Sequence, residues 1–314
     1  MKLAVNLAPH RPGGFWLANP VIAASGTFGY GTEYADLIDR EQLGAIVSKA
    51  VALTPRAGNP MPRLYETPAG LLNAIGLQGI GVERVIAEKA PLWASWRVPV
   101  IVNLVGESIA EFCGVVERLS GVAGVAGFEL NVSCPNVEGG TLFGDDPQLA
   151  AELTRAVRQR TDLPLLVKLA PTAPDLIAVA RAVAAAGADA LVVANTWPGM
   201  AIDLATRRPV FPGGGGGLSG PAIRPLSLRL VYRVAGAVAL PVVGCGGVAT
   251  AADALEYLMA GACAVQVGTM TFREPSAMLA ILAGLREFGE REGLRDLADI
   301  IGAAQPRPVA GGER

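Results

Sequence analysis

The sequence predicts an α/β protein, a (β/α)8 barrel, from three observations on its 314 residues. Eight short apolar runs rich in β-branched residues recur along the chain, and each stops at a polar or glycine-rich turn. Helix-like stretches separate many of these runs, and apolar strands that alternate with helices indicate a parallel sheet buried on both faces. The length suits a barrel, which typically needs about 250 residues. The alternative is an open doubly wound sheet, which usually has fewer strands.

The predicted elements follow one another along the chain. Two of the intervening stretches carry helix signals: residues 145–160 open with aspartates that can cap a helix and place Pro147 in the first turn, and residues 173–189 have helical spacing of apolar residues. The predicted strands lie within residues 19–27, 44–51, 99–106, 127–134, 164–170, 190–196, 241–247 and 264–270.

The remaining length falls into three segments. Residues 1–20 form an N-terminal extension, residues 55–80 an insertion after the second strand, and residues 197–220 an insertion after the sixth. Loops of this length in a compact domain are more often functional than idle. No repeat or linker divides the chain, so we expect one domain over residues 1–314.

Composition narrows the class of partner. The formal net charge is −2 and no basic stripe is present, which argues against nucleic acid and anionic membranes as partners and favours small molecules. Four cysteines without a C-x-x-C pair predict a cytoplasmic protein with reduced thiols and no metal site. Residues 234–252 are uncharged, but Pro241 and several glycines interrupt them, so we expect no membrane span, and no secretory signal is recognised.

The carboxyl ends of the predicted strands carry a distinctive set of side chains. In a barrel, the loops that follow these ends build the active site. The set contains amides, hydroxyls, two ammonium groups, a thiol and two glycine turns, but no His, Asp or Glu of the kind that a metal site or a glycosidase needs. Its members are Ser25, Lys49, Asn103, Asn131, Cys134, Lys168, Asn195, Thr196, Gly246, Gly247, Gly268 and Thr269.

The two glycine turns follow the seventh and eighth strands. Barrels commonly bind phosphate at this place through backbone N–H groups. Gly246–Gly247 and Gly268–Thr269 therefore predict a phosphorylated cofactor or substrate. The alternative is that the glycines only permit tight turns.

Lys49 and Lys168 each end a strand, where a buried ammonium needs an anionic or electron-rich partner. Three interpretations remain open: a salt bridge to a loop carboxylate, a Schiff-base lysine, or a cation that stabilises negative charge on a cofactor ring. Asn103, Asn131 and Asn195 can both donate and accept hydrogen bonds, so with Asn73 they suit a cyclic amide or imide, although each can also be a structural amide.

Cys134 lies just beyond a strand end, in the stretch GFELNVSCPNVEGG. The only histidine is His10, which argues against a Cys-His nucleophile. A thiolate can instead act as a general base that removes a proton from carbon when the electrons have an acceptor. A free thiol has a pKa of about 8.5, so activity is expected to rise with pH. The alternative for any cysteine is a small buried apolar residue, which suits Cys113, Cys245 and Cys263.

Six separated blocks resemble class 1 dihydroorotate dehydrogenases, in the family's order and over nearly the whole chain up to about residue 275. The resemblance implies a barrel with one FMN per chain that oxidises (S)-dihydroorotate to orotate in de novo pyrimidine biosynthesis. The blocks are NPVIAASGTFGYGTEY, LLNAIGLQ, ELNVSCPNVEGG, LLVKLAP, GGLSGPAIRPLSL, and VVGCGGV followed by VQVGT.

The resemblance also assigns roles to residues. Cys134 is the base that takes the C5 proton while hydride leaves C6 for the flavin, and Lys168 offsets charge on the reduced ring. The implied substrate residues are Lys49, Asn73, Ala74, Ile75, Gly76, Leu77, Asn131, Asn195 and Thr196. The implied FMN residues are Ser25, Lys49, Ala50, Asn103, Asn131, Lys168, Ala194, Gly220, Gly246, Gly247, Gly268 and Thr269.

Within class 1, the chain looks most like the type 1B catalytic subunit, whose partner subunit carries FAD and a [2Fe-2S] cluster and reduces NAD. The family implies a homodimer or a heterotetramer. The chain departs from the family pattern at Gly79-Ile80-Gly81 and at Cys245. Four alternatives stay open: a fumarate-linked type 1A enzyme, a dihydropyrimidine dehydrogenase-like flavin barrel, a phosphate-binding Schiff-base lyase, and an inactive scaffold subunit. Membrane-associated class 2 enzymes resemble the chain less, because they have Ser at the position of Cys134.

Overall fold

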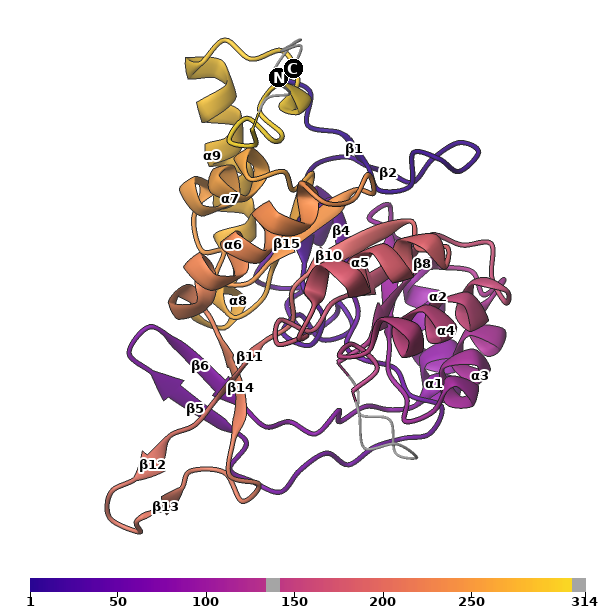
Figure 1. The fold of residues 1–314 in the computed structure, drawn as a ribbon, viewed down its shortest axis with the longest axis vertical. Coiled ribbons are helices and arrows are strands. Elements are labelled where there is room, and N and C mark those ends of the chain that lie inside the picture. Colours follow the sequence, from indigo (N-terminus) through magenta and orange to yellow (C-terminus); the bar gives the residue numbers. More distant parts are fainter. Residues whose placement is uncertain (134–141, 307–314) are drawn as a thin grey trace, which may run out of the picture.

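The computed structural model describes residues 1–133 and 142–306. At its centre, eight parallel strands close into a barrel (Figure 1), which confirms the predicted fold class. Seven predicted runs enclose an observed strand, and the fourth strand begins two residues before its run. Around the barrel the strands are β3 (Val21–Ala23), β4 (Ala45–Val47), β7 (Val100–Leu104), β8 (Val125–Asn131), β9 (Leu165–Lys168), β10 (Ala190–Val193), β15 (Val242–Cys245) and β16 (Ala264–Val267), which pairs with β3.

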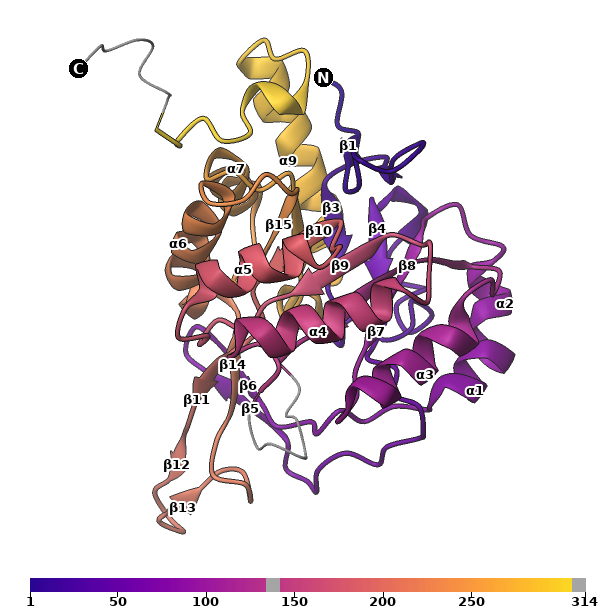
Figure 2. The same ribbon diagram turned by 45° about the vertical axis from the view of Figure 1, so that its right-hand side comes forward.

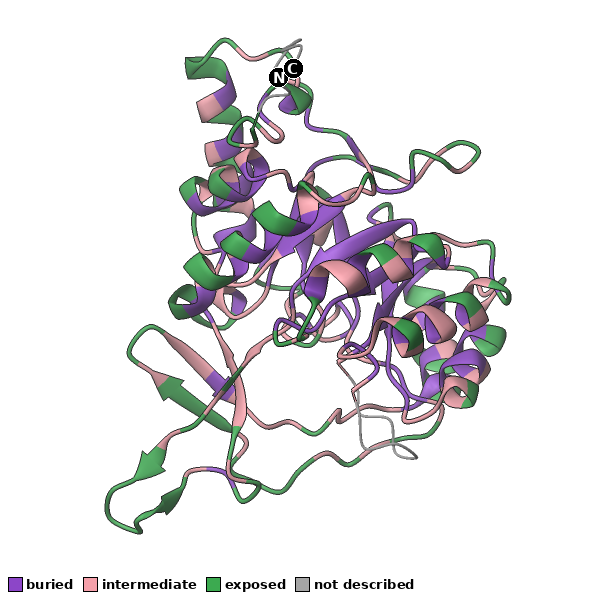
Figure 3. Ribbon diagram, viewed as in Figure 1, coloured by how far each residue is buried: buried purple, intermediate pink, exposed green. Residues whose placement is uncertain are grey.

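Helices surround the barrel with their apolar faces turned inward (Figure 3). The two helices predicted from sequence are present: the side chain of Asp146 caps α4, and that of Asp175 caps α5. The longer helices are α3 (Ile109–Leu119), α4 (Pro147–Arg158), α5 (Leu176–Ala185), α6 (Arg224–Ala235), α7 (Ala251–Met259) and α9 (Ala277–Arg291). Shorter helical segments are Arg40–Gln42, α1 (Val82–Arg84), a π-helical turn Val85–Lys89, α2 (Ala90–Trp93), Pro221–Ile223, α8 (Met270–Arg273) and Leu297–Asp299.

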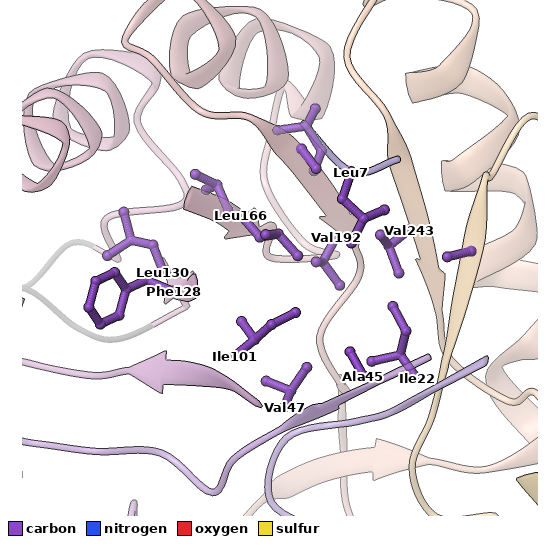
Figure 4. Packing of buried hydrophobic residues seen from close by; sticks show 14 of the residues in the cluster. Leu7, Ile22, Ala45, Val47, Ile101, Phe128, Leu130, Leu166, Val192 and Val243 are labelled. Carbon is purple, nitrogen blue, oxygen red and sulfur yellow. The ribbon is translucent and has the colours of Figure 1, made fainter. Parts of the chain in front are cut away.

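The core contains side chains from all the barrel strands (Figure 4). Ile22, Ile101, Leu166 and Val192 are fully buried there, as the apolar runs predict. Leu7 of the N-terminal extension joins the same cluster. Burying a side chain of this size stabilises the fold by roughly 1.5–3 kcal/mol, so the barrel is a packed core rather than a pore.

The N-terminal extension is held at the amino end of the barrel strands. Its strands β1 (Val5–Asn6) and β2 (Trp16–Leu17) form an antiparallel pair. The ring of His10 lies 2.8 Å from the carboxylate of Asp189, which also accepts a hydrogen bond of 2.7 Å from the Leu165 N–H at the start of β9. Nearer the terminus, the Lys2 N–H donates to the Arg295 carbonyl oxygen. The N-terminus is therefore fastened to the side of the barrel opposite the strand ends that carry the predicted site.

The two insertions pair with each other, which the sequence did not predict. Together they build a sheet with the strand order β11-β14-β6-β5, and a separate hairpin, β12 with β13, extends beyond it (Figure 2). Because the insertions follow β4 and β10, this sheet stands over the carboxyl ends of the barrel strands. Its strands are β5 (Leu64–Thr67), β6 (Gly70–Asn73), β11 (Trp197–Gly199) and β14 (Gly216–Ser219), and the hairpin consists of β12 (Ile202–Asp203) and β13 (Arg208–Pro209).

Within residues 1–133 and 142–306, no helix combines the length and the apolar character that crossing a bilayer requires.

Candidate active site

A cavity of about 770 Å³ opens at the carboxyl ends of the barrel strands, beneath the sheet formed by the insertions. Every predicted site residue that the structure describes lines it. They are Ser25, Lys49, Ala50, Asn73, Ala74, Ile75, Gly76, Leu77, Asn103, Asn131, Lys168, Ala194, Asn195, Thr196, Gly220, Gly246, Gly247, Gly268 and Thr269. Cys134 lies outside the described residues, and Ser133, which precedes it, lines the cavity.

One end of the cavity is made of backbone. The N–H groups of Gly246, Gly247, Gly268 and Thr269 find no acceptor among the described residues. The Tyr257 hydroxyl donates a hydrogen bond of 2.6 Å to the Gly246 carbonyl oxygen and so fixes the first turn. Adjacent unpaired N–H groups in such turns suit an anion, and a phosphate satisfies them.

Gly247 shows why glycine is needed at this end. Its φ is +74°, and a Cβ there would lie 2.7 Å from the backbone nitrogen of Arg224. We expect Gly247→Ala to weaken the binding of FMN, the phosphorylated cofactor that the resemblance implies, by about tenfold or more, equivalent to about 1.4 kcal/mol. Fluorescence titration of the apoprotein with FMN measures this change.

The matched control is Gly293→Ala. Gly293 also has a positive φ of +64°, but a Cβ at this residue would meet no atom within 4 Å, and Gly293 does not line the cavity. The variant carries only the backbone strain of about 1–3 kcal/mol, so its FMN affinity should be unchanged. Equal FMN affinities in the two variants would argue against a phosphate cradle.

The amides on another wall orient one another. The Oδ1 atom of Asn131, at the end of β8, accepts hydrogen bonds from Asn195 Nδ2 at 3.2 Å and from the Ser133 N–H at 3.3 Å. Asn195 Oδ1 accepts from the Thr196 N–H at 2.7 Å. Asn73 Nδ2 donates to the Gly217 carbonyl oxygen at 3.1 Å and so joins the two insertions. Because each amide already uses its oxygen or its NH2 group within the protein, these contacts determine which group remains to bind a ligand.

The segment between β6 and α1 presents backbone to the cavity. Leu77 has a φ of +54°, a left-handed conformation that is uncommon outside glycine. None of the described residues accepts a hydrogen bond from the N–H groups of Ile75, Gly76 and Leu77. Strained backbone with available donors is typical of a ligand clamp, here for carbonyl or carboxylate oxygens.

Lys49 is a half-buried cation on the same side. No described carboxylate pairs with its ammonium, whose Nζ lies 3.5 Å from the Gln78 amide oxygen. Burial lowers the pKa of Lys49, the charge of Arg63 lowers it further, and Glu33 opposes the change. A negatively charged ligand would stabilise the Lys49 ammonium against burial and the charge of Arg63. The described residues therefore do not support a salt bridge within the protein for Lys49.

Lys168 differs, because it has a carboxylate partner. Its ammonium donates to the Gln266 amide oxygen at 2.9 Å and to Ser25 Oγ at 3.4 Å, and lies 3.6 Å from Glu129 Oε1. Lys168 therefore forms a salt bridge within the protein, to a carboxylate in strand β8 rather than in a loop, and it also lines the cavity.

Sequence reasoning missed Glu129 and Gln266. It considered the last residues of each strand, and Glu129 lies two residues before the end of β8 and Gln266 one before the end of β16. A signal existed, because each is a polar residue in an otherwise apolar buried run. Cys245, interpreted as an apolar residue, also lines the cavity.

The described residues fit a phosphorylated planar cofactor. The glycine turns provide N–H groups for phosphate. Asn103 is fully buried, lines the cavity and leaves its Oδ1 without a partner among the described residues, as an acceptor for a ring N–H requires. Lys168 adds a positive charge on the same wall.

Comparisons with known proteins agree with this geometry. Residues 11–288 match the family model described as dihydroorotate dehydrogenase. The chain is similar to the dihydroorotate dehydrogenase B (NAD(+)) catalytic subunits of Geotalea daltonii, 50% identical over 92% of this chain and 95% of the relative, and of Pelobacter propionicus, 50% identical over 96% and 98%. That of Desulforudis audaxviator is 48% identical over 97% and 98%.

Proposed function

This chain belongs to the dihydroorotate dehydrogenase family, and from that premise we propose that it is the FMN-binding catalytic subunit of a type 1B enzyme. It oxidises (S)-dihydroorotate to orotate in de novo pyrimidine biosynthesis, with NAD as the final acceptor. The observation that carries the proposal is the single cavity in which a phosphate cradle, a buried cation and a set of amides meet.

The substrate side of the cavity suits dihydroorotate. The Lys49 ammonium, which has no carboxylate partner among the described residues, pairs with the substrate carboxylate. Asn73, Asn131 and Asn195 hold the ring through its carbonyl and N–H edges, together with Thr196 and the backbone of residues 74–77. Two-point contact with the carboxylate and the imide edges fixes which face of the ring meets the base.

Cys134 is the proposed base. It takes the C5 proton of the substrate as a thiolate, and the C5–H bonding electrons form the C5=C6 double bond as hydride leaves C6. FMN, when bound, supplies the two-electron oxidant that accepts hydride from C6. The proposed FMN residues would hold it: the glycine turns would bind its phosphate, and the other members of the set are Ser25, Lys49, Ala50, Asn103, Asn131, Lys168, Ala194 and Gly220.

We assign the remaining redox groups to a partner. The names of the relatives, which are catalytic subunits of NAD(+) enzymes, support a second subunit that carries FAD and a [2Fe-2S] cluster. The assembly is then a homodimer of this chain or a heterotetramer with that subunit. Cys113, Cys245 and Cys263 are free thiols, which supports a cytoplasmic location.

Purification and assay of the chain test the proposal. The isolated protein is expected to be yellow, to release FMN on denaturation at one per chain, and to be bleached by dihydroorotate without oxygen. Reduction of NAD is expected only when the electron-transfer subunit is added. A colourless protein that does not bind added FMN would contradict the proposal.

The same preparation separates the alternatives. Rapid turnover with fumarate alone would identify a type 1A enzyme, and flavin oxidation by uracil would identify a dihydropyrimidine dehydrogenase-like enzyme. A lysine adduct trapped by borohydride would identify a Schiff-base lyase. Flavin that stays oxidised with every substrate would identify an inactive scaffold.

A further inference from the structure

Glu129 is a buried carboxylate that contacts three other barrel strands. It lies on β8 and is fully buried. Its Oε1 accepts a hydrogen bond of 2.7 Å from Asn103 Nδ2 on β7 and lies 3.6 Å from Lys168 Nζ on β9. Its Oε2 accepts from Gln266 Nε2 on β16. Both oxygens are therefore occupied, and Oε1 faces Asn103 and Lys168, which line the cavity.

A carboxylate only accepts hydrogen bonds, so it fixes the orientation of both amides. Asn103 must turn its NH2 group toward Glu129, which leaves Oδ1 as a buried acceptor without a partner among the described residues. Gln266 must do the same, and its Oε1 consequently accepts from Lys168 at 2.9 Å. With a neutral amide at position 129, either amide could flip.

The charges around Lys168 point to the same residue. Among the described residues, the titratable groups that face its ammonium are Cys245 on β15 and Glu129 on β8. Burial opposes the charge of Lys168, while Glu129 and the thiolate form of Cys245 favour it, and the pKa of Lys168 is raised overall. Burial also raises the pKa of Cys245, so that thiol is neutral at pH 7. Glu129 is the anion that acts on Lys168 at neutral pH.

We propose that Glu129 is a positioning residue of this enzyme, which pairs with the buried Lys168 ammonium and, by binding the Asn103 NH2 group, leaves the Asn103 carbonyl oxygen as an acceptor for a cofactor N–H. It touches neither substrate nor cofactor and acts through these two side chains. The inference rests on the proposed flavin function and adds to it the residue that sets the polarity of the cavity floor.

The test is Glu129→Gln, which keeps the shape of the side chain and removes its charge. The chain contains only four lysines, so NMR of protein with isotope-labelled lysine can follow Lys168 by itself in the holoenzyme, with its signal assigned from Lys168→Arg. We expect the pKa of Lys168 to fall by about one unit or more, the size associated with a lost neighbouring charge. The Lys49 signal serves as an internal reference and should not shift.

Two measurements on the cofactor accompany the titration of Lys168 in Glu129→Gln. The affinity of the apoenzyme for FMN is expected to fall by about tenfold. The midpoint potential of bound FMN at pH 7 is expected to become less negative, because Lys168 stays protonated while the anion that offsets its charge is removed. The control is Glu117→Gln, an exposed carboxylate on α3 that pairs with Arg160, for which no readout should change. An unchanged Lys168 pKa and FMN affinity in Glu129→Gln would overturn the proposal.

Glu129→Asp distinguishes charge from packing. If Glu129 only fills space, the isosteric glutamine is the milder change and aspartate the more damaging one. If its charge matters, aspartate keeps the pKa of Lys168 near the wild-type value and glutamine does not. Should Glu129→Gln fail to fold, Glu129→Met, an uncharged side chain of similar length, takes its place: a fall in the Lys168 pKa of about one unit supports the proposal, and an unchanged pKa overturns it.

The outcomes are separable from those of the proposed function. A wild-type protein without FMN would refute the flavin function, yet the Lys168 titration would still compare wild type with Glu129→Gln. A yellow, active wild type with an unresponsive Lys168 would refute only the role of Glu129.

Discussion

Replacing Cys134 with alanine is expected to lower the rate of flavin reduction by dihydroorotate by about two to four powers of ten, the usual contribution of a positioned general base. FMN should stay bound, because Cys134 is not among the residues proposed to hold it, which line the cavity. Anaerobic stopped-flow mixing of the oxidised enzyme with dihydroorotate measures the rate directly.

The pH dependence gives a second measurement of the same base. A free thiol has a pKa of about 8.5, so the wild-type rate is expected to rise between pH 7 and pH 9 as the thiolate forms. The alanine variant should lose this rise. Cys113→Ala is the control, because Cys113 is buried on α3 and does not line the cavity. A Cys134→Ala enzyme that reduces its flavin at the wild-type rate would exclude the thiolate as the base.

Replacing Lys168 with alanine is expected to have the largest effect on stability of any change in the cavity. It leaves the fully buried Glu129 carboxylate without its cation, and breaking a buried pair in this way costs about 3–5 kcal/mol. FMN binding should weaken at the same time, because the cavity loses the charge beside the ring. Urea unfolding and the FMN content of the purified protein measure the two effects.

The raised pKa of Lys168 determines the pH at which the stability of the variant should be compared with that of the wild type. Its pKa is raised in the folded protein, so its contribution to stability is fully present below the unfolded lysine pKa of about 10.4 and is lost only as pH rises through the folded value. Measurements at pH 7 therefore capture the whole contribution.

Two further variants test whether the unpaired Glu129 carboxylate causes the loss of stability in Lys168→Ala. Lys49→Ala removes a half-buried lysine without a carboxylate partner among the described residues, so it should raise KM and leave the free energy of unfolding nearly unchanged. Adding Glu129→Gln to Lys168→Ala should restore part of the lost stability, because the unpaired charge is gone. A double variant as unstable as the sum of both single changes would argue against coupling between the two residues.

The barrel was predictable because its strands are buried on both faces. Such strands must be apolar throughout, so runs such as residues 99–106 and 190–196 identify themselves without any partner. The closure of the barrel then brings the strand ends together, which is why residues as distant in sequence as Ser25 and Gly268 line one cavity.

The sheet above the cavity was not predictable by the same reasoning. β5 is largely exposed and β14 contains two glycines, so neither has the apolar signature of a buried strand. Asn73 and Gly217 pair across 144 positions of sequence, and no local pattern signals such a partner. The insertions were recognised only by their length.

The polar side chains that line the cavity were only partly predictable from the sequence. That residue types such as Asn103 and Lys168 face a ligand follows from their place at strand ends. Which of their atoms does so depends on Glu129 and Gln266, whose contacts cross the barrel. Strand periodicity indicates which face a side chain occupies but not the partner that orients it, so this level of detail required the three-dimensional structure.

The attachment of the N-terminal extension has a practical consequence. Lys2 is held against the segment after α9, and the start of the chain lies at the far end of the molecule from the sheet over the cavity (Figure 1). A fusion partner or a biosensor tether joined at Met1 therefore stands clear of the mouth through which dihydroorotate enters. An immobilised enzyme prepared in this way should process substrate as freely as the enzyme in solution.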